Sequence, residues 1–264
     1  YGESDYKYFL YTCIINAVVG GLLLLYGRGA ENKMSRRDGY CVVTLSWVFF
    51  TFFGMLPFYF SGSIDTITNA FFETMSGFTT TGATILDDIE SLSHGMLFWR
   101  SLTQWIGGLG IVFFTIAILP IFTTGGVQLF SAESTGVTHD RTHPKINVMA
   151  KWLWTIYLVL TVSETVLLMF GGMSLFDAIC QSFATTATGG YSTKQNSISY
   201  WNSPYIEYVV AIFMIVSSIN FSLFLMCLKG KVGRLFKDEE LHWFLASVGI
   251  LTFLITLALV FQNH

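Results

Sequence analysis

The chain has 264 residues and a formal net charge of −3, and 53% of its residues are hydrophobic whereas only 12% are charged. A soluble domain carries about 25% charged residues, so this composition excludes a soluble globular protein and indicates a polytopic membrane protein. The net charge indicates little about partners, because in membrane proteins the distribution of Lys and Arg matters more than their sum.

Apolar runs long enough to cross a bilayer recur along the chain. A hydrocarbon core of roughly 30 Å takes about 20 residues of helix. In chain order the runs cover residues 8–25, 40–60, 96–122, 152–170, 205–228 and 242–261. We expect each run to form a membrane-spanning helix. The segment before the first run is polar and acidic, so we expect no cleavable signal peptide.

Basic residues gather in three of the five connectors between these runs. The second and fourth connectors, residues 61–95 and 171–204, contain only Lys194 between them. Cytoplasmic loops of membrane proteins are enriched in Lys and Arg. The sequence therefore predicts that the second and fourth connectors lie outside and the three basic connectors lie in the cytoplasm.

The two outer connectors contain an internal repeat. The segment NAFFETMSGFTTTGAT, which starts at Asn69, aligns with DAICQSFATTATGGYS, which starts at Asp177, at a constant offset of 108 residues. A helix-compatible first half precedes a Thr/Gly-rich tail in both copies. Such a repeat indicates one structural unit used twice. Each unit would contain an apolar helix, a short helix (66–77 or 174–185), a polar glycine-bearing segment and a second apolar helix.

This order of elements is the plan of an ion channel with re-entrant pore loops. Non-helical backbone is tolerated at membrane depth only where protein buries it or where it lines a water-filled cavity. Rings of backbone carbonyls can replace the water around a cation, and glycine permits the unusual dihedrals that such a ring needs. The partly negative C-terminal ends of the short helices would face the cation. The Thr/Gly segments are therefore candidate ion filters.

Acidic residues follow the first candidate filter on its outer side, at Asp87, Asp88 and Glu90. They either raise the local cation concentration or belong to an ordinary solvated loop. Both readings stay open.

The motifs as a set resemble the Trk/Ktr/HKT superfamily of potassium transporters, closest to its TrkH-type subunits, over nearly the whole chain. The matching motifs are RRDGY at 36–40, NAFFETMSGFTTTGAT at 69–84, WRSLTQWIGGLGI at 99–111, FDAICQSFATTATGGYST at 176–193 and SSINF at 217–221. The resemblance implies an all-α polytopic membrane protein with repeated units of helix, re-entrant pore helix and filter loop, and helix, as in potassium channels. It further implies potassium-selective, channel-like uptake and no enzymatic activity.

In that superfamily one glycine per filter favours potassium over sodium. Carried over to this sequence, the resemblance implicates the backbones of Gly82 and Gly190 as potassium ligands. The flanking filter residues would be Thr80, Thr81, Ala83, Thr188, Gly189 and Tyr191. The resemblance implies potassium as the transported ligand, no cofactor in this chain, and no nucleic-acid partner. It also implies a homodimer in the inner (plasma) membrane with a cytosolic nucleotide-binding regulator of the TrkA type.

The repeats set the expected domain boundaries. We expect part of an N-terminal hairpin and its linker at 1–39, the first pore repeat at 40–123 and a cytoplasmic connector at 124–148. The second pore repeat would cover 149–230 and the first helix of a third repeat 231–264. Because family members carry four repeats, we expect the chain to be a contiguous piece of a longer protein that does not conduct by itself. Pairing of two chains around one axis is the alternative.

Functions other than potassium transport are also compatible with parts of the sequence. A sodium-permeable or sodium-coupled transporter of the same superfamily and a non-transporting membrane scaffold stay open. An intramembrane enzyme is disfavoured, because we find neither an intramembrane His paired with a Ser or Cys nucleophile nor a pair of aspartates on facing helices.

Several single polar residues in or near the apolar runs are supporting candidates. Arg100 is either a snorkelling anchor or a tie to the filter loop or a nearby acid. Glu207 is expected at the interface or supporting the filter, and Asn220 either ties neighbouring helices or lines the cavity below the filter. Glu164 is deeper in its run, so it either packs or perturbs the ion path.

Two patterns that suggest ligand sites have simpler explanations. His139 and His143 have the spacing of metal ligands on a helix, but the Pro that follows disfavours helix and favours a solvated loop. The glycines at 107, 108 and 110 lie within an apolar run, where they favour close helix approach over nucleotide binding. The cysteines are Cys13, Cys41, Cys180 and Cys227, and their wide separation favours packing over metal or disulfide roles.

Overall fold

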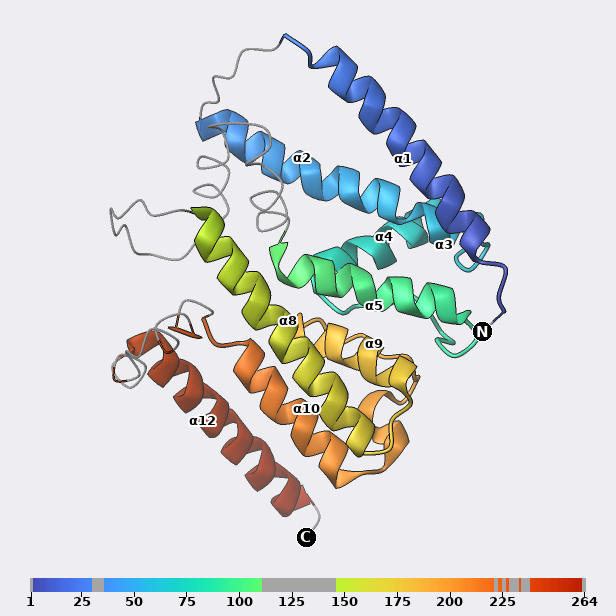
Figure 1. Ribbon diagram of the computed structural model, residues 1–264. Helices are drawn as coiled ribbons and strands as arrows, with labels where there is room; N and C mark the ends of the chain where they lie inside the picture. The colour runs from blue at the N-terminus through green and yellow to red at the C-terminus, as the bar shows by residue number, and fades with distance from the viewer. Residues whose placement is uncertain are drawn as a thin grey trace. The chain divides into compact units, whose positions relative to one another are not determined.

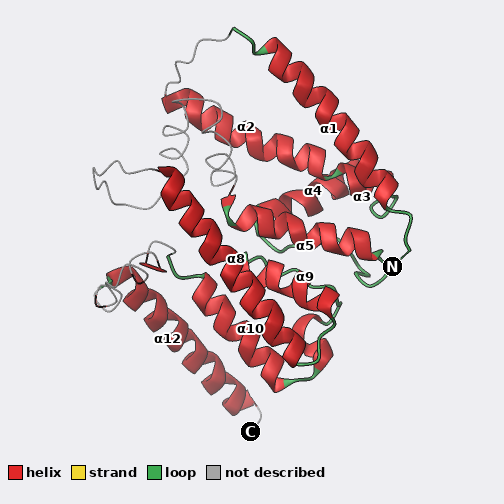
Figure 2. Ribbon diagram, viewed as in Figure 1, coloured by secondary structure: helices red, strands yellow, loops and turns green. Residues whose placement is uncertain are grey.

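The computed structural model describes residues 2–29, 36–110, 146–220 and 238–262, with a few positions between 220 and 238. All regular secondary structure in this part of the chain is helical (Figures 1 and 2). The chain divides into one unit of Tyr1–Ser217 and another of Ser218–His264. The third predicted run beyond residue 110, and the histidine pair at 139 and 143, lie outside the described residues.

The first unit begins with three helices: α1 (Tyr6–Tyr26), α2 (Arg36–Gly54) and α3 (Leu56–Phe60). The predicted single helix over 40–60 is therefore broken after Gly54. Pro57 explains the break, because proline has no N–H to donate and is tolerated in the first turn of a helix but not in its interior. Gly54 also brings α2 close to α4, since a Cβ there would lie 2.7 Å from the Phe78 ring.

The first repeat continues with α4 (Ile67–Phe78) and α5 (His94–Gly108). The Ser93 hydroxyl caps α5 by accepting a hydrogen bond from the Met96 N–H at 3.4 Å. A buried apolar cluster holds α3, α4, α5 and the outer loop together. It consists of Met55, Phe58, Ile64, Ala70, Ile89, Leu92, Met96 and Leu97.

The second repeat comprises α8 (Ile146–Phe170), α9 (Leu175–Thr186), the 3₁₀ helix η2 (Ser197–Trp201) and α10 (Pro204–Ser217). Helices α8, α9 and α10 pack against one another (Figure 1). Their buried apolar cluster is Leu168, Met173, Ala178, Ile206, Val209 and Val210. The fifth predicted run differs from the structure, because α10 ends at Ser217. The Ser and Asn side chains of SSIN compete with the backbone for hydrogen bonds, which disfavours helix there.

The second unit contains α12 (Glu239–Gln262), which has no buried residue. The Asp238 carboxylate caps it by accepting a hydrogen bond from the Leu241 N–H at 2.9 Å. Asn220 lies in this unit as well, after α10 rather than inside a helix, and its Nδ2 donates to Glu240 Oε2 at 3.3 Å.

Three helical segments of the described chain are long and apolar enough to cross a membrane: Tyr6–Tyr26, Lys151–Phe170 and Glu239–Gln262. Two shorter apolar helical segments are Thr44–Phe60 and Pro204–Ser217. The first and last of the long segments are almost wholly exposed, at 6% and 0% buried. Apolar surface of this extent is stable only in an apolar surrounding, so the fold is that of an all-α polytopic membrane protein.

Candidate ion-filter site

The short helices α4 and α9 begin in the same way. Thr66 Oγ1 accepts a hydrogen bond from the Asn69 N–H at 3.2 Å, and Ser174 Oγ accepts one from the Asp177 N–H at 3.1 Å. Each cap satisfies one N–H that the first turn of a helix leaves without a partner. The helices start and end at residues related by the 108-residue offset, one residue later than the predicted 66–77 and 174–185.

The two helices also end in the same way. In the first, the N–H of Thr80 donates to the Gly77 carbonyl at 3.0 Å and the N–H of Thr81 to the Ser76 carbonyl at 2.9 Å. The second copy repeats this pair of bonds at Thr188 and Gly189, with lengths of 2.9 and 2.8 Å. This pattern is a Schellman cap, whose turning residue adopts a left-handed conformation.

Threonine occupies the turning position of both caps, with φ of +53° at Thr80 and +55° at Thr188. A β-branched residue in this region is a strained outlier, and such strain gathers at functional sites. Gly82 and Gly190 follow two residues later with φ of +77° and +84°. The backbone thus shows the internal repeat more clearly than the side chains do.

The two turns lie against each other. A Cβ added to Gly82 would overlap the carbonyl oxygen of Gly189 and would lie 3.9 Å from the Gly190 Cα. A Cβ on Gly190 would meet open space. In the described part of the chain, the carbonyl oxygens of residues 80–82 and 188–190 accept no hydrogen bond. These oxygens therefore remain available to a ligand, as a filter requires.

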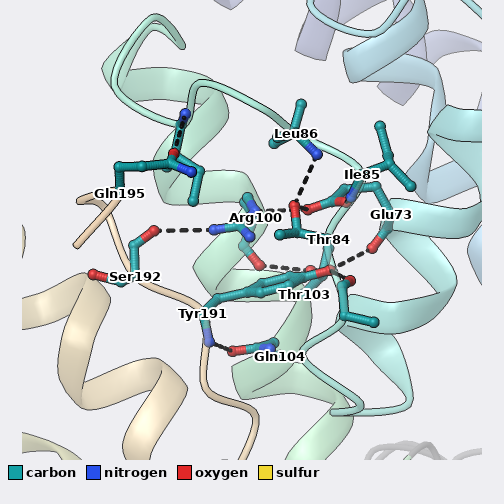
Figure 3. A network of polar contacts seen from close by, with 12 residues as sticks. Glu73, Thr84, Ile85, Leu86, Arg100, Thr103, Gln104, Tyr191, Ser192 and Gln195 are labelled. Atoms are coloured by element: carbon teal, nitrogen blue, oxygen red, sulfur yellow. Dashed lines mark hydrogen bonds and ion pairs between the residues drawn. The ribbon is translucent and has the colours of Figure 1, made fainter. Parts of the chain in front are cut away.

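A buried ion pair lies behind the turns (Figure 3). Arg100 Nε donates to Glu73 Oε1 at 2.8 Å, and the two side chains are 2% and 0% exposed. Arg100 Nη1 donates to the Ser192 carbonyl at 3.0 Å. Such burial excludes a snorkelling side chain, so Arg100 joins α4 to the loop that follows the second turn.

Glu73 also holds the chain that leaves the first turn. Its Oε1 accepts a hydrogen bond from the Thr84 hydroxyl at 2.9 Å, and its Oε2 accepts one from the Ile85 N–H at 3.0 Å. Gln104 does the same for the second turn, because its Oε1 accepts a hydrogen bond from the Tyr191 N–H at 3.1 Å. Our sequence reasoning missed both residues. A carboxylate inside a short apolar helix is the signal that could have identified Glu73.

Tyr191 is also a predicted filter residue, but its side chain is buried, with 1% of its surface exposed, and so does not face an open path. Its ring lies under the Arg100 guanidinium, 3.6 Å from Cζ to the ring centroid. Its hydroxyl lies 2.8 Å from the Glu73 carbonyl oxygen and 3.3 Å from that of Ala83. Figure 3 shows this side chain reaching from the second loop to the first repeat.

The outer ends of the two loops are joined near the surface. Lys194 Nζ lies 3.3 Å from Glu90 Oε2, and the Ile89 N–H donates to Gln195 Oε1 at 3.0 Å. Partial burial lowers the pKa of the Lys194 ammonium, but the hydrogen bond and charge of Glu90 outweigh it, so the pKa lies above its ordinary value. Asp88 Oδ1 accepts hydrogen bonds from two backbone N–H groups of its own loop.

Two of the remaining candidates, Glu207 and Glu164, take no part in this network. Glu207 is exposed in the first turn of α10, and Asn220 lies in the second unit. Glu164 is fully buried in α8, where its Oε2 accepts a hydrogen bond from the Thr186 hydroxyl at 3.3 Å, at the end of α9. Among the residues that the structure describes, no group of three or more His, Cys, Asp or Glu side chains is arranged to hold a metal ion.

Comparison with known proteins identifies close relatives. The family described as TrkH, cation transport protein, matches residues 6–262. The Trk system potassium uptake protein TrkH of Escherichia coli is 41% identical over 266 aligned positions, which cover 100% of this chain and 55% of that protein. The Trk system potassium uptake protein TrkG of Escherichia coli is 34% identical and covers 93% of this chain and 51% of its own length.

A solved structure has the same fold. The crystal structure of the potassium transporter TrkH from Vibrio parahaemolyticus superposes with a TM-score of 0.83 at 32% identity, over 100% of this chain and 54% of that one. The chain therefore spans about half the length of the relatives that it matches.

Proposed function

We propose that this chain, which belongs to the TrkH family of cation transport proteins, contributes two filter turns to a potassium-selective uptake pathway. The observation that carries the proposal is the pair of adjoining turns whose carbonyl oxygens at 80–82 and 188–190 accept no hydrogen bond. Each turn follows the C-terminal end of a short helix, which carries about half a negative charge and favours a cation.

In this proposal the ligands are backbone oxygens and the side chains hold them in place. Gly82 and Gly190 supply left-handed positions, so that successive carbonyls can face a common path. Thr80, Thr81 and Ala83 flank the first glycine. Thr188, Gly189 and Tyr191 flank the second. Potassium is the cargo, and the chemistry is replacement of the water around the ion rather than catalysis.

The broader assembly is proposed on the resemblance to Trk system proteins. We place the full-length protein in the inner (plasma) membrane as a homodimer. A cytosolic nucleotide-binding subunit of the TrkA type would dock on the basic inner connectors. The names of the relatives, which denote a Trk system, support an assembly with further subunits.

Glycine substitutions in the full-length protein test the filter assignment. An L-residue in the left-handed region costs roughly 1–2 kcal/mol, a factor of about 5–30. In proteoliposomes we expect Gly190→Ala to lower the ratio of potassium to sodium uptake by about this factor. We expect Gly82→Ala to lower it further, because the added Cβ also meets the Gly189 carbonyl.

Gly62→Ala is the matched control, because Gly62 has φ of +70° with open space around its Cβ and lies outside the turns. It should keep the parent ratio. If both filter variants also kept it, the assignment of the turns as the filter would be wrong. A parent protein that took up sodium as readily as potassium would favour a sodium-permeable member of the family.

A further inference from the structure

Tyr191 makes a contact between the two repeats that neither repeat contains alone. Its backbone belongs to the second turn, whereas both oxygens near its hydroxyl belong to the first repeat. One is the carbonyl of Glu73, within α4. The other is the carbonyl of Ala83, directly after Gly82. The hydroxyl therefore reaches the point at which the chain leaves the first turn.

The ring of Tyr191 is fixed by charge as well as by packing. The Arg100 guanidinium covers one face of the ring, and a cation over an aromatic face is attracted most where water is excluded. Arg100 is itself fixed by Glu73 on one side and by the Ser192 carbonyl on the other. Three buried groups from α4, α5 and the second loop thus hold one another in place.

In the described part of the chain, the first repeat has no side chain that makes the equivalent contact with the second. At the offset of 108 residues, Tyr191 corresponds to Ala83 and Glu73 corresponds to Gln181. Alanine has no side chain that could reach a neighbouring repeat. The Oε1 of Gln181 is buried without a hydrogen-bond partner among the described residues. The Gln181 side-chain oxygen therefore does not hold the second loop as the Glu73 carboxylate holds the first.

We propose that Tyr191 is a positioning residue for the first filter, so that the second repeat sets the shape of the first turn. The inference rests on the proposed function of the turns. The Tyr191 hydroxyl lies 3.3 Å from the Ala83 carbonyl oxygen and shares its one hydrogen between that oxygen and the nearer Glu73 carbonyl. No described residue donates a hydrogen bond to the corresponding Tyr191 carbonyl. The carbonyl that follows the glycine is therefore contacted by a hydroxyl in the first turn and by none in the second.

The test is Tyr191→Phe in the full-length protein, which removes the hydroxyl and keeps the ring on Arg100. A single hydrogen bond changes an equilibrium by roughly two- to tenfold, and we expect the ratio of potassium to sodium uptake to fall by that factor. The matched control is Tyr200→Phe, because Tyr200 is 51% exposed in η2 and lies outside the turns. It should leave the ratio unchanged.

Combination with the filter variants shows which turn is affected. If Tyr191→Phe acts on the first turn, it adds less to Gly82→Ala than to Gly190→Ala. In a parent protein that prefers potassium, equal additions to both, or a Tyr191→Phe ratio equal to that of the Tyr200→Phe control, overturn the proposal.

Hydrogen exchange supplies a readout that does not depend on transport. We expect the Ile85 amide, which donates to Glu73, to exchange roughly two- to tenfold faster in Tyr191→Phe. The Gly189 amide, bonded within its own cap, should not change. Faster exchange at Ile85 in a protein that does not prefer potassium would refute the proposed function and keep the positioning role. Unchanged exchange at Ile85 would refute the positioning role alone.

Discussion

At the scale of single residues, two fully buried carboxylates differ in their partners. Glu73 has Arg100, the Thr84 hydroxyl and the Ile85 N–H. Glu164 forms no ion pair with any described residue: its Oε2 accepts a hydrogen bond from the Thr186 hydroxyl, and its Oε1 has no hydrogen-bond partner in the described chain. Removing one member of a buried ion pair leaves an uncompensated charge, whereas removing a carboxyl group that has no cationic partner leaves none.

We therefore expect Glu73→Gln and Glu164→Gln to have unlike effects on stability. Glu73→Gln should lower the free energy of unfolding by about 3–5 kcal/mol, because Arg100 stays buried without its partner. Glu164→Gln should leave it within about 1 kcal/mol of the parent. Thermal unfolding of the two variants in detergent compares them directly, and equal losses would contradict this account of the network.

The same residues show how far sequence reasoning could reach. The resemblance to the superfamily predicts Gly82 and Gly190, and the 108-residue repeat places the two glycines at equivalent positions. The partner of Arg100 stayed open, and Glu73 and Gln104 were missed. The reason is that their partners belong to another repeat: Ser192 lies 92 residues beyond Arg100. The local sequence pattern indicates which residues are unusual for their surroundings. It does not indicate which residues of a distant loop contact them.

At the scale of elements, hydrophobicity predicted the helices better than their ends. The short helices were placed to within one residue, because each begins at a Thr or Ser that caps it. The sequence predicts one helix for each of the runs 40–60 and 205–228, but α2 ends at Gly54 and α10 at Ser217. Hydrophobicity does not reveal where a helix is broken inside an apolar run, because burial in lipid or protein favours apolar residues on both sides of the break.

The connectors give a test of how these elements cross the membrane. In a variant whose four native cysteines are replaced, we expect Asp65→Cys and Asn196→Cys to react with a membrane-impermeant thiol reagent from outside the cell. Gly27→Cys should react only after permeabilisation, because its connector is basic and predicted cytoplasmic. All three positions are exposed. Labelling of Asp65→Cys and Asn196→Cys from opposite sides would contradict the repeated unit.

At the scale of the whole molecule, the two repeats share one interior. The Trp105 ring of α5 stacks on Phe183 of α9 with centroids 5.1 Å apart, and the Tyr157 hydroxyl of α8 donates to the Trp105 carbonyl at 2.9 Å. Gly108 permits this approach, since a Cβ there would lie 2.6 Å from the Tyr157 hydroxyl oxygen. The two Thr/Gly turns are thus held by a junction between repeats rather than by either repeat alone.

The proposed assembly is tested on the same scale. We expect the purified full-length protein to have the mass of a dimer in detergent, and a TrkA-type subunit to bind it. Binding should weaken by roughly tenfold or more as salt rises from about 50 to 200 mM, because attraction between exposed charges is screened. Mass photometry and titration at several salt concentrations provide the measurement. A monomer that binds no such subunit would refute both parts.

The contact between Gly82 and the Gly189 carbonyl also restrains how such a protein can evolve. One extra carbon atom at position 82 collides with the main chain of the other turn, so a larger residue becomes tolerable only after that main chain has shifted. The two turns can therefore change at this contact only together. The present chain fits this restraint: its two copies differ in most side chains, yet Thr80 still aligns with Thr188 and Gly82 with Gly190.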